Sequence, residues 1–229
     1  MSEILDYSVK NSFEVYESAV RSEMLEFIPD SAEKILDVGC SVGNFGHLLK
    51  SERKVEVWGV EIDQQASEKA AEKLDKVLCG EFGSELDLPK DYFDCVVFND
   101  VLEHMIDPYT ALVFTKQLLK KNGMIIASIP NVRYFDNMWN LIVHCRWDYV
   151  DSGILDRTHL RFFTKKSILS TFTNLGYEIE TLAGINSLEK YDAYYMRKFN
   201  FLNFLSFRKI EDMRWMQFAV VAKPSRKLE

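Results

Sequence analysis

The first 130 residues alternate between short apolar runs and amphipathic stretches. The apolar runs are rich in valine and isoleucine and stop at a glycine or a polar residue, which is typical of buried strands. We expect five such strands, at residues 34–38, 54–63, 76–80, 93–100 and 124–130. Because these runs are nearly continuous in apolar residues, they predict a parallel sheet that helices cover on both faces.

The stretches between the predicted strands place apolar residues at helical spacing. We expect helices at 44–51 and 64–74, and a third around 111–119 that Asn122–Gly123 ends as a C-cap. Asp63 directly precedes the second helix and is expected to cap it. Strand and helix therefore alternate in the manner of a doubly wound α/β fold.

The pattern changes after Pro130, where aromatic residues become frequent. In order, we expect an irregular aromatic segment at 131–163, a helix at 164–175, a strand at 177–184, a mostly helical aromatic segment at 186–212 and a last strand at 215–223. Thr164 is a suitable N-cap for the late helix, and Gly176 is a suitable stop.

We interpret the chain as one domain over residues 1–229. Residues 11–28 have helical spacing and Pro29 ends that helix, so the N-terminal part is expected to form a lid. Long segments between late strands are frequent sites of specificity. The expected parts are a helical lid at 1–32, a binding core at 33–132, and two lid-like insertions at about 131–163 and 185–213.

Composition narrows the class of protein. The chain has 229 residues, of which 47% are hydrophobic, and a formal net charge of −7. This acidic balance argues against a nucleic-acid partner, which needs clustered lysine and arginine. No apolar run approaches the ~20 residues that span a bilayer, and the N-terminus lacks the order of a signal peptide. The four cysteines have no paired spacing, so we expect a reduced, cytoplasmic protein without a metal site.

The loop that follows the first strand is rich in glycine. Its sequence, GCSVGNFG from Gly39 to Gly46, fits neither the G-x-G-x-x-G pattern of dinucleotide sites nor the phosphate-loop pattern. No basic residue lies between Lys34 and His47, so the loop favours a ligand that is not strongly anionic. Asp37, just before the loop, would attract an ammonium or sulfonium group instead.

Two further carboxylates close the next strands of the predicted sheet. Glu61 ends the second strand, 22 residues beyond Gly39 (61 − 39), where a carboxylate can accept both hydroxyls of a ribose. Glu81 follows Gly80 at the end of the third strand, where it could meet an adenine amino group. The carboxyl ends of these strands are therefore the expected binding edge of the sheet.

Five segments together resemble a known family. ILDVGCSVGNFG, VWGVEID, VLCGEF, FDCVVFNDVLEHMIDP and NGMIIASIPNV are similar, in order and spacing, to the motifs of class I S-adenosylmethionine-dependent methyltransferases. The resemblance covers Lys34 to Val132. It implies a Rossmann-like doubly wound sheet of about seven strands, mostly parallel, with one antiparallel strand that WMQFAVVAK supplies. It also implies S-adenosyl-L-methionine as cofactor and S-adenosyl-L-homocysteine as product. Ser41 departs from the glycine that many members carry.

The resemblance assigns roles to the residues at the strand ends. The loop backbone would approach the methionine part of the cofactor, and Asp37 would position its amino group. Glu61 would hold the ribose, while Ile62 and residues 81–82 would contact the adenine. The residues that close the fourth strand would line the reacting methyl group. His104 would lie at the cofactor edge or at the acceptor, or serve only in packing. The implied cofactor-binding residues are Asp37, Gly39, Cys40, Gly43, Asn44, Glu61, Ile62, Gly80, Glu81, Phe82, Asn99, Asp100, Val101 and His104.

The sequence constrains the identity of the methyl acceptor less than that of the cofactor. The segment after the fourth strand lacks the Pro-Pro-aromatic run that resembles enzymes methylating DNA or glutamine nitrogen, so a hydroxyl of a small molecule or sugar-derived acceptor is the default. GILDRTHLRFFT resembles a stretch of methyltransferases linked to bacterial glycan pathways. His159 is the candidate base. The candidate acceptor-binding residues are Tyr16, Tyr134, Arg157 and Arg161.

Alternatives remain open at this level. Residues 156–161 could instead form a structural network in which Asp156 pairs with an arginine. The aromatic insertions also suit a quinone-like acceptor, and a protein that binds S-adenosylmethionine without catalysis is a third interpretation. The sequence leaves the oligomeric state undecided.

Overall fold

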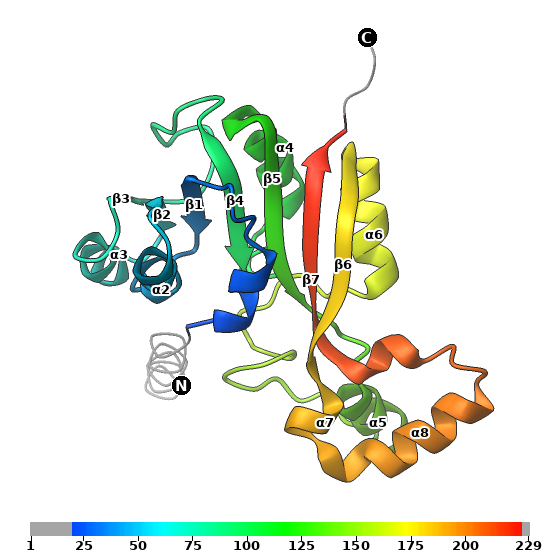
Figure 1. The fold of residues 1–229 in the computed structure, drawn as a ribbon. Coiled ribbons are helices and arrows are strands. Elements are labelled where there is room, and N and C mark those ends of the chain that lie inside the picture. The colour runs from blue at the N-terminus through cyan, green and yellow to red at the C-terminus, as the bar shows by residue number, and fades with distance from the viewer. Residues whose placement is uncertain (1–19, 226–229) are drawn as a thin grey trace.

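The computed structural model describes residues 20–225 and contains one seven-stranded sheet. The strand order is β3-β2-β1-β4-β5-β7-β6, and β7 is antiparallel to both of its neighbours. The strands are β1 (Lys34–Val38), β2 (Glu56–Glu61), β3 (Lys76–Cys79), β4 (Phe93–Asn99), β5 (Leu119–Pro130), β6 (Tyr177–Ser187) and β7 (Trp215–Pro224). The expected fold class is confirmed, including the antiparallel last strand (Figure 1).

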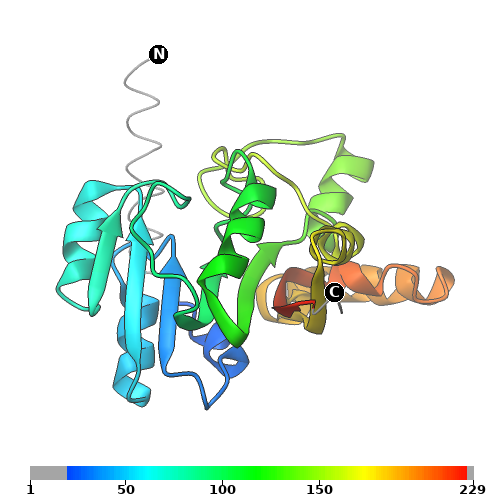
Figure 2. The same cartoon turned by 90° about the horizontal axis from the view of Figure 1, so that it is seen from above.

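Helices cover both faces of this sheet (Figures 1 and 2). On one face, α4 and α6 pack with Val96 and Phe98 of β4. On the other, η1, α2 and α3 pack with Cys95 and Val97 of the same strand. Successive strand residues point to opposite faces, so a continuous apolar run supplies two cores at once. The helices are η1 (Ser22–Phe27), α2 (Asn44–Glu52), α3 (Gln64–Ala71), α4 (Pro108–Leu118), α5 (Phe135–His144), α6 (Lys165–Asn174), α7 (Leu188–Tyr191), η2 (Ala193–Tyr195), α8 (Met196–Leu205) and η3 (Glu211–Arg214).

Local capping explains where several helices begin. The side chain of Asp63 accepts from the backbone N–H of Ala66, so Asp63 caps α3 as predicted. Asp107 accepts from two backbone N–H groups at the start of α4, where proline is the first helical residue. Thr164 and Ser167 form a reciprocal capping box at the start of α6. The predicted cap of α6 is thereby confirmed.

The boundary between α4 and β5 differs from the prediction. The helix ends at Leu118 and the strand begins at Leu119, so the Asn122–Gly123 pair lies within β5 and is not a helix C-cap. The ladder between β4 and β5 shifts register between Phe93 and Cys95, which accommodates the extra residues of β5. A Cβ at Gly123 would lie 2.9 Å from the carbonyl oxygen of Phe93. The glycine therefore serves a close approach of two strands.

Two other segments also depart from expectation. Residues 131–163 were expected to be irregular, yet they contain the helix α5. Residues 11–19 of the predicted N-terminal helix lie outside the described residues, and the part from 22 to 27 is a 3-10 helix. The role of residues 1–32 as a lid stays a prediction.

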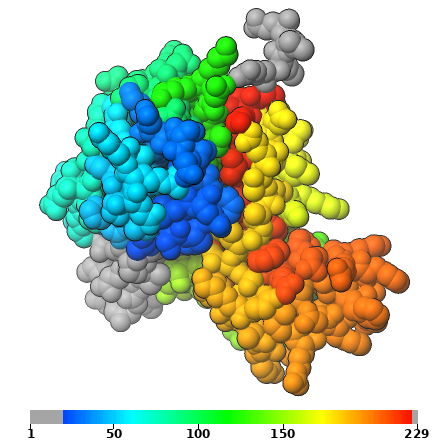
Figure 3. All heavy atoms as spheres, in the orientation of Figure 1, coloured from blue at the N-terminus to red at the C-terminus, as the bar shows by residue number. Residues whose placement is uncertain are grey.

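An aromatic lobe, defined as residues 133–144 and 188–214, lies beyond the end of the sheet at which β4 and β5 finish (Figures 1 and 3). Its own hydrophobic cluster joins α5 to the segment between β6 and β7 through Tyr134, Phe135, Leu188, Phe199 and Met213. The two predicted insertions thus meet in space, although a lid function for them stays a prediction. Among residues 20–225, no helix combines the length and hydropathy that crossing a bilayer requires.

Candidate active site

The loop after β1 adopts a backbone that favours glycine. Gly39 and Gly43 have φ angles of 68° and 76°, in the left-handed region. A Cβ at Gly39 would lie 2.6 Å from Cγ2 of Val101, so the loop packs directly on the segment that follows β4. The backbone N–H groups of Gly39 and Cys40 both donate to the carbonyl oxygen of Val60, which ties the loop to β2.

Ser41 adopts the conformation that a glycine would take at this position. Its φ is 47°, and its backbone N–H donates to Oε2 of Glu61 at 2.8 Å. The backbone N–H of Asp63 donates to Oε1 of the same carboxylate at 3.0 Å. The departure from the family pattern is therefore tolerated locally. Glu61 is fixed at the end of β2 beside the loop, and its contact with a ribose stays a prediction.

Asp37 presents a buried carboxyl group at the end of β1. Its side chain is only 2% exposed. Burial, with a smaller contribution from the Glu61 carboxylate, raises the pKa of Asp37 to about 8. A cationic ligand beside it would restore the charged form. This environment suits the ammonium or sulfonium group expected from the sequence.

The ends of β2 and β3 provide an apolar platform. Ile62 is 71% exposed directly after Glu61, which is unusual for a large aliphatic side chain at a strand end. Phe82 stacks edge-on against Phe98 and Phe114. Gly80 has a φ of 150°, and Glu81 beyond it is exposed.

Two predicted cofactor residues use their side chains elsewhere. The thiol of Cys40 is buried against Gly59, where a Cβ would lie 2.6 Å from Sγ, and burial raises its pKa. The side-chain oxygen of Asn44 accepts from Nζ of Lys73 at 2.8 Å. Both side chains therefore serve the protein's own packing and hydrogen bonding in this structure.

Asn99 ends β4 with an unsatisfied side chain. Its Oδ1 and Nδ2 atoms are buried, and neither has a hydrogen-bond partner among the described residues. Native proteins pair most buried polar groups, so an orphaned amide at a strand end indicates a missing ligand. Together with the buried Asp37 and the exposed Ile62, it fits a ligand that carries a cation, a sugar and an apolar ring. S-adenosylmethionine has these three parts.

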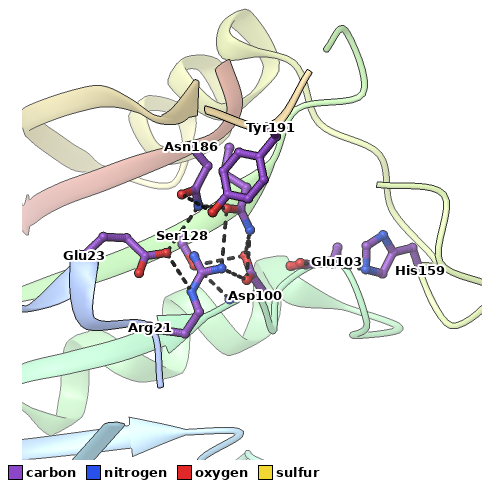
Figure 4. A network of polar contacts seen from close by, with 9 residues as sticks. Arg21, Glu23, Asp100, Glu103, Ser128, His159, Asn186 and Tyr191 are labelled. Carbon is purple, nitrogen blue, oxygen red and sulfur yellow. Dashed lines mark hydrogen bonds and ion pairs between the residues drawn. The ribbon is translucent and has the colours of Figure 1, made fainter. Parts of the chain in front are cut away.

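Asp100 is held within a polar network rather than left open to a ligand (Figure 4). Its carboxylate lies 2.6 Å from an Arg21 guanidinium nitrogen and accepts from Nε2 of Gln217 at 2.8 and 2.9 Å and from the Ser128 hydroxyl at 3.0 Å. Gln217 in turn accepts from Asn186. Burial raises the pKa of Asp100 while Arg21 opposes that shift. The network joins the start of η1 to the ends of β4, β5, β6 and β7.

A second polar cluster lies next to this network and contains Glu103, His104 and His159 (Figure 4 draws Glu103 and His159). Nε2 of His159 is 3.9 Å from Oε1 of Glu103, and the two imidazole rings lie edge to face with centroids 4.6 Å apart. Burial and the nearby Asp100 carboxylate raise the pKa of Glu103 well above its usual range. Burial and the neighbouring His159 lower the pKa of His104 to about 4. The structure thus brings the two predicted histidines together.

The segment 156–161 is held by local contacts. Asp156 accepts from the backbone N–H and the hydroxyl of Thr158, whereas Arg157 pairs with Asp151 at 2.9 Å. Arg161 donates to the carbonyl oxygens of Leu160 and Ile106. A structural network is therefore present, in which Asp156 holds Thr158 and Arg157 holds Asp151.

The remaining predicted acceptor residues do not gather at one place. Tyr134 is buried in the aromatic lobe, and its hydroxyl donates to Asp192 at 2.7 Å. Arg157 is exposed beside Asp151. Tyr16 lies outside the described residues.

Sequence reasoning named Asp100, His104 and His159 but missed the other residues that build the two polar clusters. Glu103, Ser128 and Gln217 each stand among apolar neighbours, in VLEHM, IASIP and WMQFA, and each is buried. A polar residue inside a run that must be buried is costly unless it is paired or used. That signal could have marked all three. Arg21 had no comparable signal, because its contact with Asp100 depends on the path of the backbone just before η1.

Solved structures with the same fold include several methyltransferases. A methyltransferase dependent on S-adenosylmethionine from Archaeoglobus fulgidus is 22% identical, with a TM-score of 0.60 over 97% of this chain and 99% of that one. One from Thermotoga maritima is 18% identical, with a TM-score of 0.63 over 97% of this chain and 96% of that one. These likenesses support the fold.

Two further comparisons concern sequence alone. A protein of Haemophilus influenzae without an assigned function is 27% identical over 146 residues, which are 53% of this chain and only 56% of that protein. The family model described as a methyltransferase domain matches residues 13–182. The matched region contains the glycine loop, the ends of β1 to β5, and Asp100, Glu103, His104 and His159. The solved structures that share its fold include methyltransferases that depend on S-adenosylmethionine. The chain itself belongs to the methyltransferase domain family.

Proposed function

We propose that this chain transfers the methyl group of S-adenosylmethionine to a hydroxyl oxygen of a small-molecule or sugar-derived acceptor. The observation that carries the proposal is the set of groups at the adjacent ends of β1, β2 and β4. Buried Asp37, the fixed carboxylate of Glu61 and the orphaned amide of Asn99 meet around a loop whose glycines admit close backbone approach. Each group suits a different part of this cofactor.

The reaction is an in-line displacement. The acceptor oxygen attacks the methyl carbon and forms the new C–O bond, while the carbon–sulfur bond breaks and its electron pair stays on sulfur. The sulfonium becomes the thioether of S-adenosylhomocysteine, and the hydroxyl proton leaves to a base. Alignment of the two reactants provides most of the acceleration in such a step. The protein therefore has to hold the cofactor rigidly and remove one proton.

The polar cluster after β4 supports an oxygen acceptor. Glu103 and His104 lie four and five residues after Asn99, and His159 packs against them. They therefore adjoin the strand end to which the resemblance assigns the methyl group. A hydroxyl needs deprotonation as it attacks, whereas a neutral amine does not. We retain His159 as the candidate proton acceptor, with its Nε2 directed toward Glu103.

Turnover measurements can test the proposal directly. The purified chain is incubated with S-adenosylmethionine and pools of sugars and sugar phosphates, and S-adenosylhomocysteine release is measured. Acceptor-dependent release that falls at least 10²-fold in His159→Ala, with cofactor affinity unchanged, is the expected result. Cofactor binding without release on any hydroxyl acceptor, but with release on amines or quinones, would contradict the oxygen-acceptor assignment.

A further inference from the structure

The cluster of Glu103, His104 and His159 has the composition of a metal site. One ligand atom from each of the three residues lies within 4.8 Å of the other two. Glu103 is 1% exposed, and neither of its carboxylate oxygens has a hydrogen-bond partner among the described residues. A buried carboxylate is costly unless it is paired, protonated or bound to a cation. This unpartnered group faces the two imidazoles.

Hydrogen bonding fixes the tautomer of His159. Its Nδ1 lies 2.9 Å from the carbonyl oxygen of Ile154. A carbonyl oxygen only accepts, so Nδ1 carries the hydrogen and Nε2 presents its lone pair. That Nε2 is the atom 3.9 Å from Glu103. A backbone carbonyl on the far nitrogen is the usual support of a metal-binding imidazole.

The same reasoning fixes the tautomer of His104. Its Nδ1 lies 3.0 Å from the hydroxyl of Thr158, and that hydroxyl donates its only proton to Asp156 at 2.6 Å. The hydroxyl oxygen therefore accepts from Nδ1, which carries the hydrogen of the neutral ring. Backbone N–H groups of Leu160 and Arg161 donate to the carbonyl oxygen of Glu103, and they hold the two segments together.

We propose that Glu103, His104 and His159 bind a divalent transition-metal cation, with Zn²⁺ or Mn²⁺ as the best match to two neutral imidazoles and one carboxylate. Metal–ligand distances of about 2.1 Å place neighbouring ligand atoms roughly 3 to 3.5 Å apart, so atoms now within 4.8 Å of one another must close by at most about 1.8 Å. Three protein ligands leave coordination positions open. If the proposed function holds, such a cation would bind the acceptor hydroxyl and lower its pKa, and His159 would then contribute as a ligand of the cation rather than as the base itself.

The test is direct metal binding to the full chain after chelator treatment. Isothermal titration with Zn²⁺ and with Mn²⁺ should show one site, and Glu103→Gln and His159→Gln should each weaken it at least 10-fold. His47→Gln is the matched control, because His47 is an exposed histidine on α2 outside the cluster. Should either buried variant fail to fold, His104→Gln provides the same test from a partly exposed position.

Two results would overturn the metal proposal: no saturable binding of either ion, or equal binding by wild type and the cluster variants. A titration with S-adenosylhomocysteine on the same samples keeps the two proposals apart. Metal binding without cofactor binding contradicts only the proposed function. Cofactor binding without metal binding contradicts only the metal site, and it leaves a proton shared between Glu103 and His159 as the explanation of the cluster.

A separate surface carries a second inference. Residues 193–210 contain four basic residues and no acidic residue, in a chain whose net charge is −7. Within this segment Phe204 is 78% exposed and Phe207 is 88% exposed, and Phe201 and Leu205 are also exposed. Figure 3 shows that this part of the aromatic lobe projects from the body of the molecule. The four basic residues are Arg197, Lys198, Arg208 and Lys209.

We infer that α8 and the turn after it dock on an anionic lipid surface. Exposed phenylalanines flanked by lysine and arginine are typical of helices that lie in the membrane interface. A hollow that adjoins this segment offers further positive charge to headgroups, because its lining has five basic side chains and two acidic ones. The basic residues are Arg133, Lys165, Lys166, Arg208 and Lys209, and the acidic residues are Glu211 and Asp212. The basic charge of this segment complements anionic headgroups, whereas a symmetric contact between two copies of the segment would bring like charges together.

Co-sedimentation with vesicles tests this surface. Vesicles with about 30% phosphatidylglycerol should retain the protein, pure phosphatidylcholine vesicles should not, and added salt should weaken retention. The double variant Phe204→Ser/Phe207→Ser should lose at least 10-fold in binding, whereas Leu169→Ser, an exposed leucine on α6, should not. No retention on anionic vesicles, or a concentration-dependent dimer that the double variant abolishes, would contradict the lipid assignment.

Discussion

Replacing Gly39 with alanine should destabilise the protein through two separable effects. The φ of 68° places residue 39 in the left-handed region, which costs an L-residue about 1–2 kcal/mol. The new Cβ would lie 2.6 Å from Cγ2 of Val101 and 3.3 Å from Cγ1. Overpacking of this kind costs about 1–3 kcal/mol. We therefore expect a loss of roughly 2–5 kcal/mol in the free energy of unfolding.

Thermal and urea unfolding measure this loss. For a chain of this size, each kcal/mol corresponds to about 2–4 °C in the midpoint, so Gly39→Ala should unfold roughly 4–20 °C lower. Gly83→Ala is the matched control, because a Cβ at Gly83 would meet nothing within 4 Å. We expect that control to lie within about 0.5 kcal/mol of wild type or to be slightly more stable.

A double-mutant cycle separates the steric effect from the backbone effect. Val101→Ala removes the two methyl groups that the new Cβ would strike, so the double variant should keep only the backbone cost at residue 39. The loss in the double variant should be smaller than the sum of the single losses by about 1–3 kcal/mol. Additive losses within about 0.5 kcal/mol would refute the packing of the loop on Val101. A loss below about 1 kcal/mol in Gly39→Ala would refute both parts.

Three further predictions follow from the site and its supports. The pKa of Asp37 is raised to about 8 in the folded chain, so ionisation of this group lowers the free energy of unfolding progressively as the pH rises from about 4 to 8. At pH 7 the carboxyl is still mostly protonated, so binding of a cationic ligand should release up to about 0.9 of a proton. Calorimetry with S-adenosylhomocysteine in two buffers should detect this release in wild type and not in Asp37→Asn; equal release in both would exclude Asp37 as its source. Asn99→Ala should weaken S-adenosylhomocysteine binding roughly 5- to 150-fold. It should change the unfolding midpoint of the unliganded protein little, because the amide has no hydrogen-bond partner among the described residues. Unchanged affinity would remove Asn99 from the site. Thr164→Ala should lower the free energy of unfolding in urea by about 0.5–2 kcal/mol, because the capping box is lost. Thr173→Ala, at an exposed position on the same helix, is the control, and an equal loss there would argue against capping as the cause.

Local sequence signals were sufficient to predict a residue's structural role where that role depends only on residues nearby in the chain. The strand at 34–38, the cap at Asp63 and the capping box at Thr164 depend on a few adjacent residues, and the structure has them where the pattern indicates. The Asn122–Gly123 pair misled for the same reason. It is a strong helix-stop signal locally, but the close approach of Phe93 on the neighbouring strand decides its role.

The polar clusters could not be predicted because their members are distant in sequence. His159 reaches Glu103 only because the loop that carries it folds back and donates two backbone hydrogen bonds to the Glu103 carbonyl. Arg21 reaches Asp100 across 79 positions (100 − 21) for a similar reason. Sequence could mark Glu103 as a costly residue in an apolar run, but it could not name the partner.

The measurement that tests the central claim most directly is thermal unfolding with S-adenosylmethionine, S-adenosylhomocysteine and NAD, each added alone. A ligand at ~100 times its dissociation constant adds about 2.7 kcal/mol, which is a rise of roughly 5 to 11 °C for a chain of this size. We expect both adenosyl ligands to raise the midpoint and NAD to leave it unchanged. A rise with NAD, or no rise with either adenosyl ligand, would contradict the assignment of the glycine loop to S-adenosylmethionine.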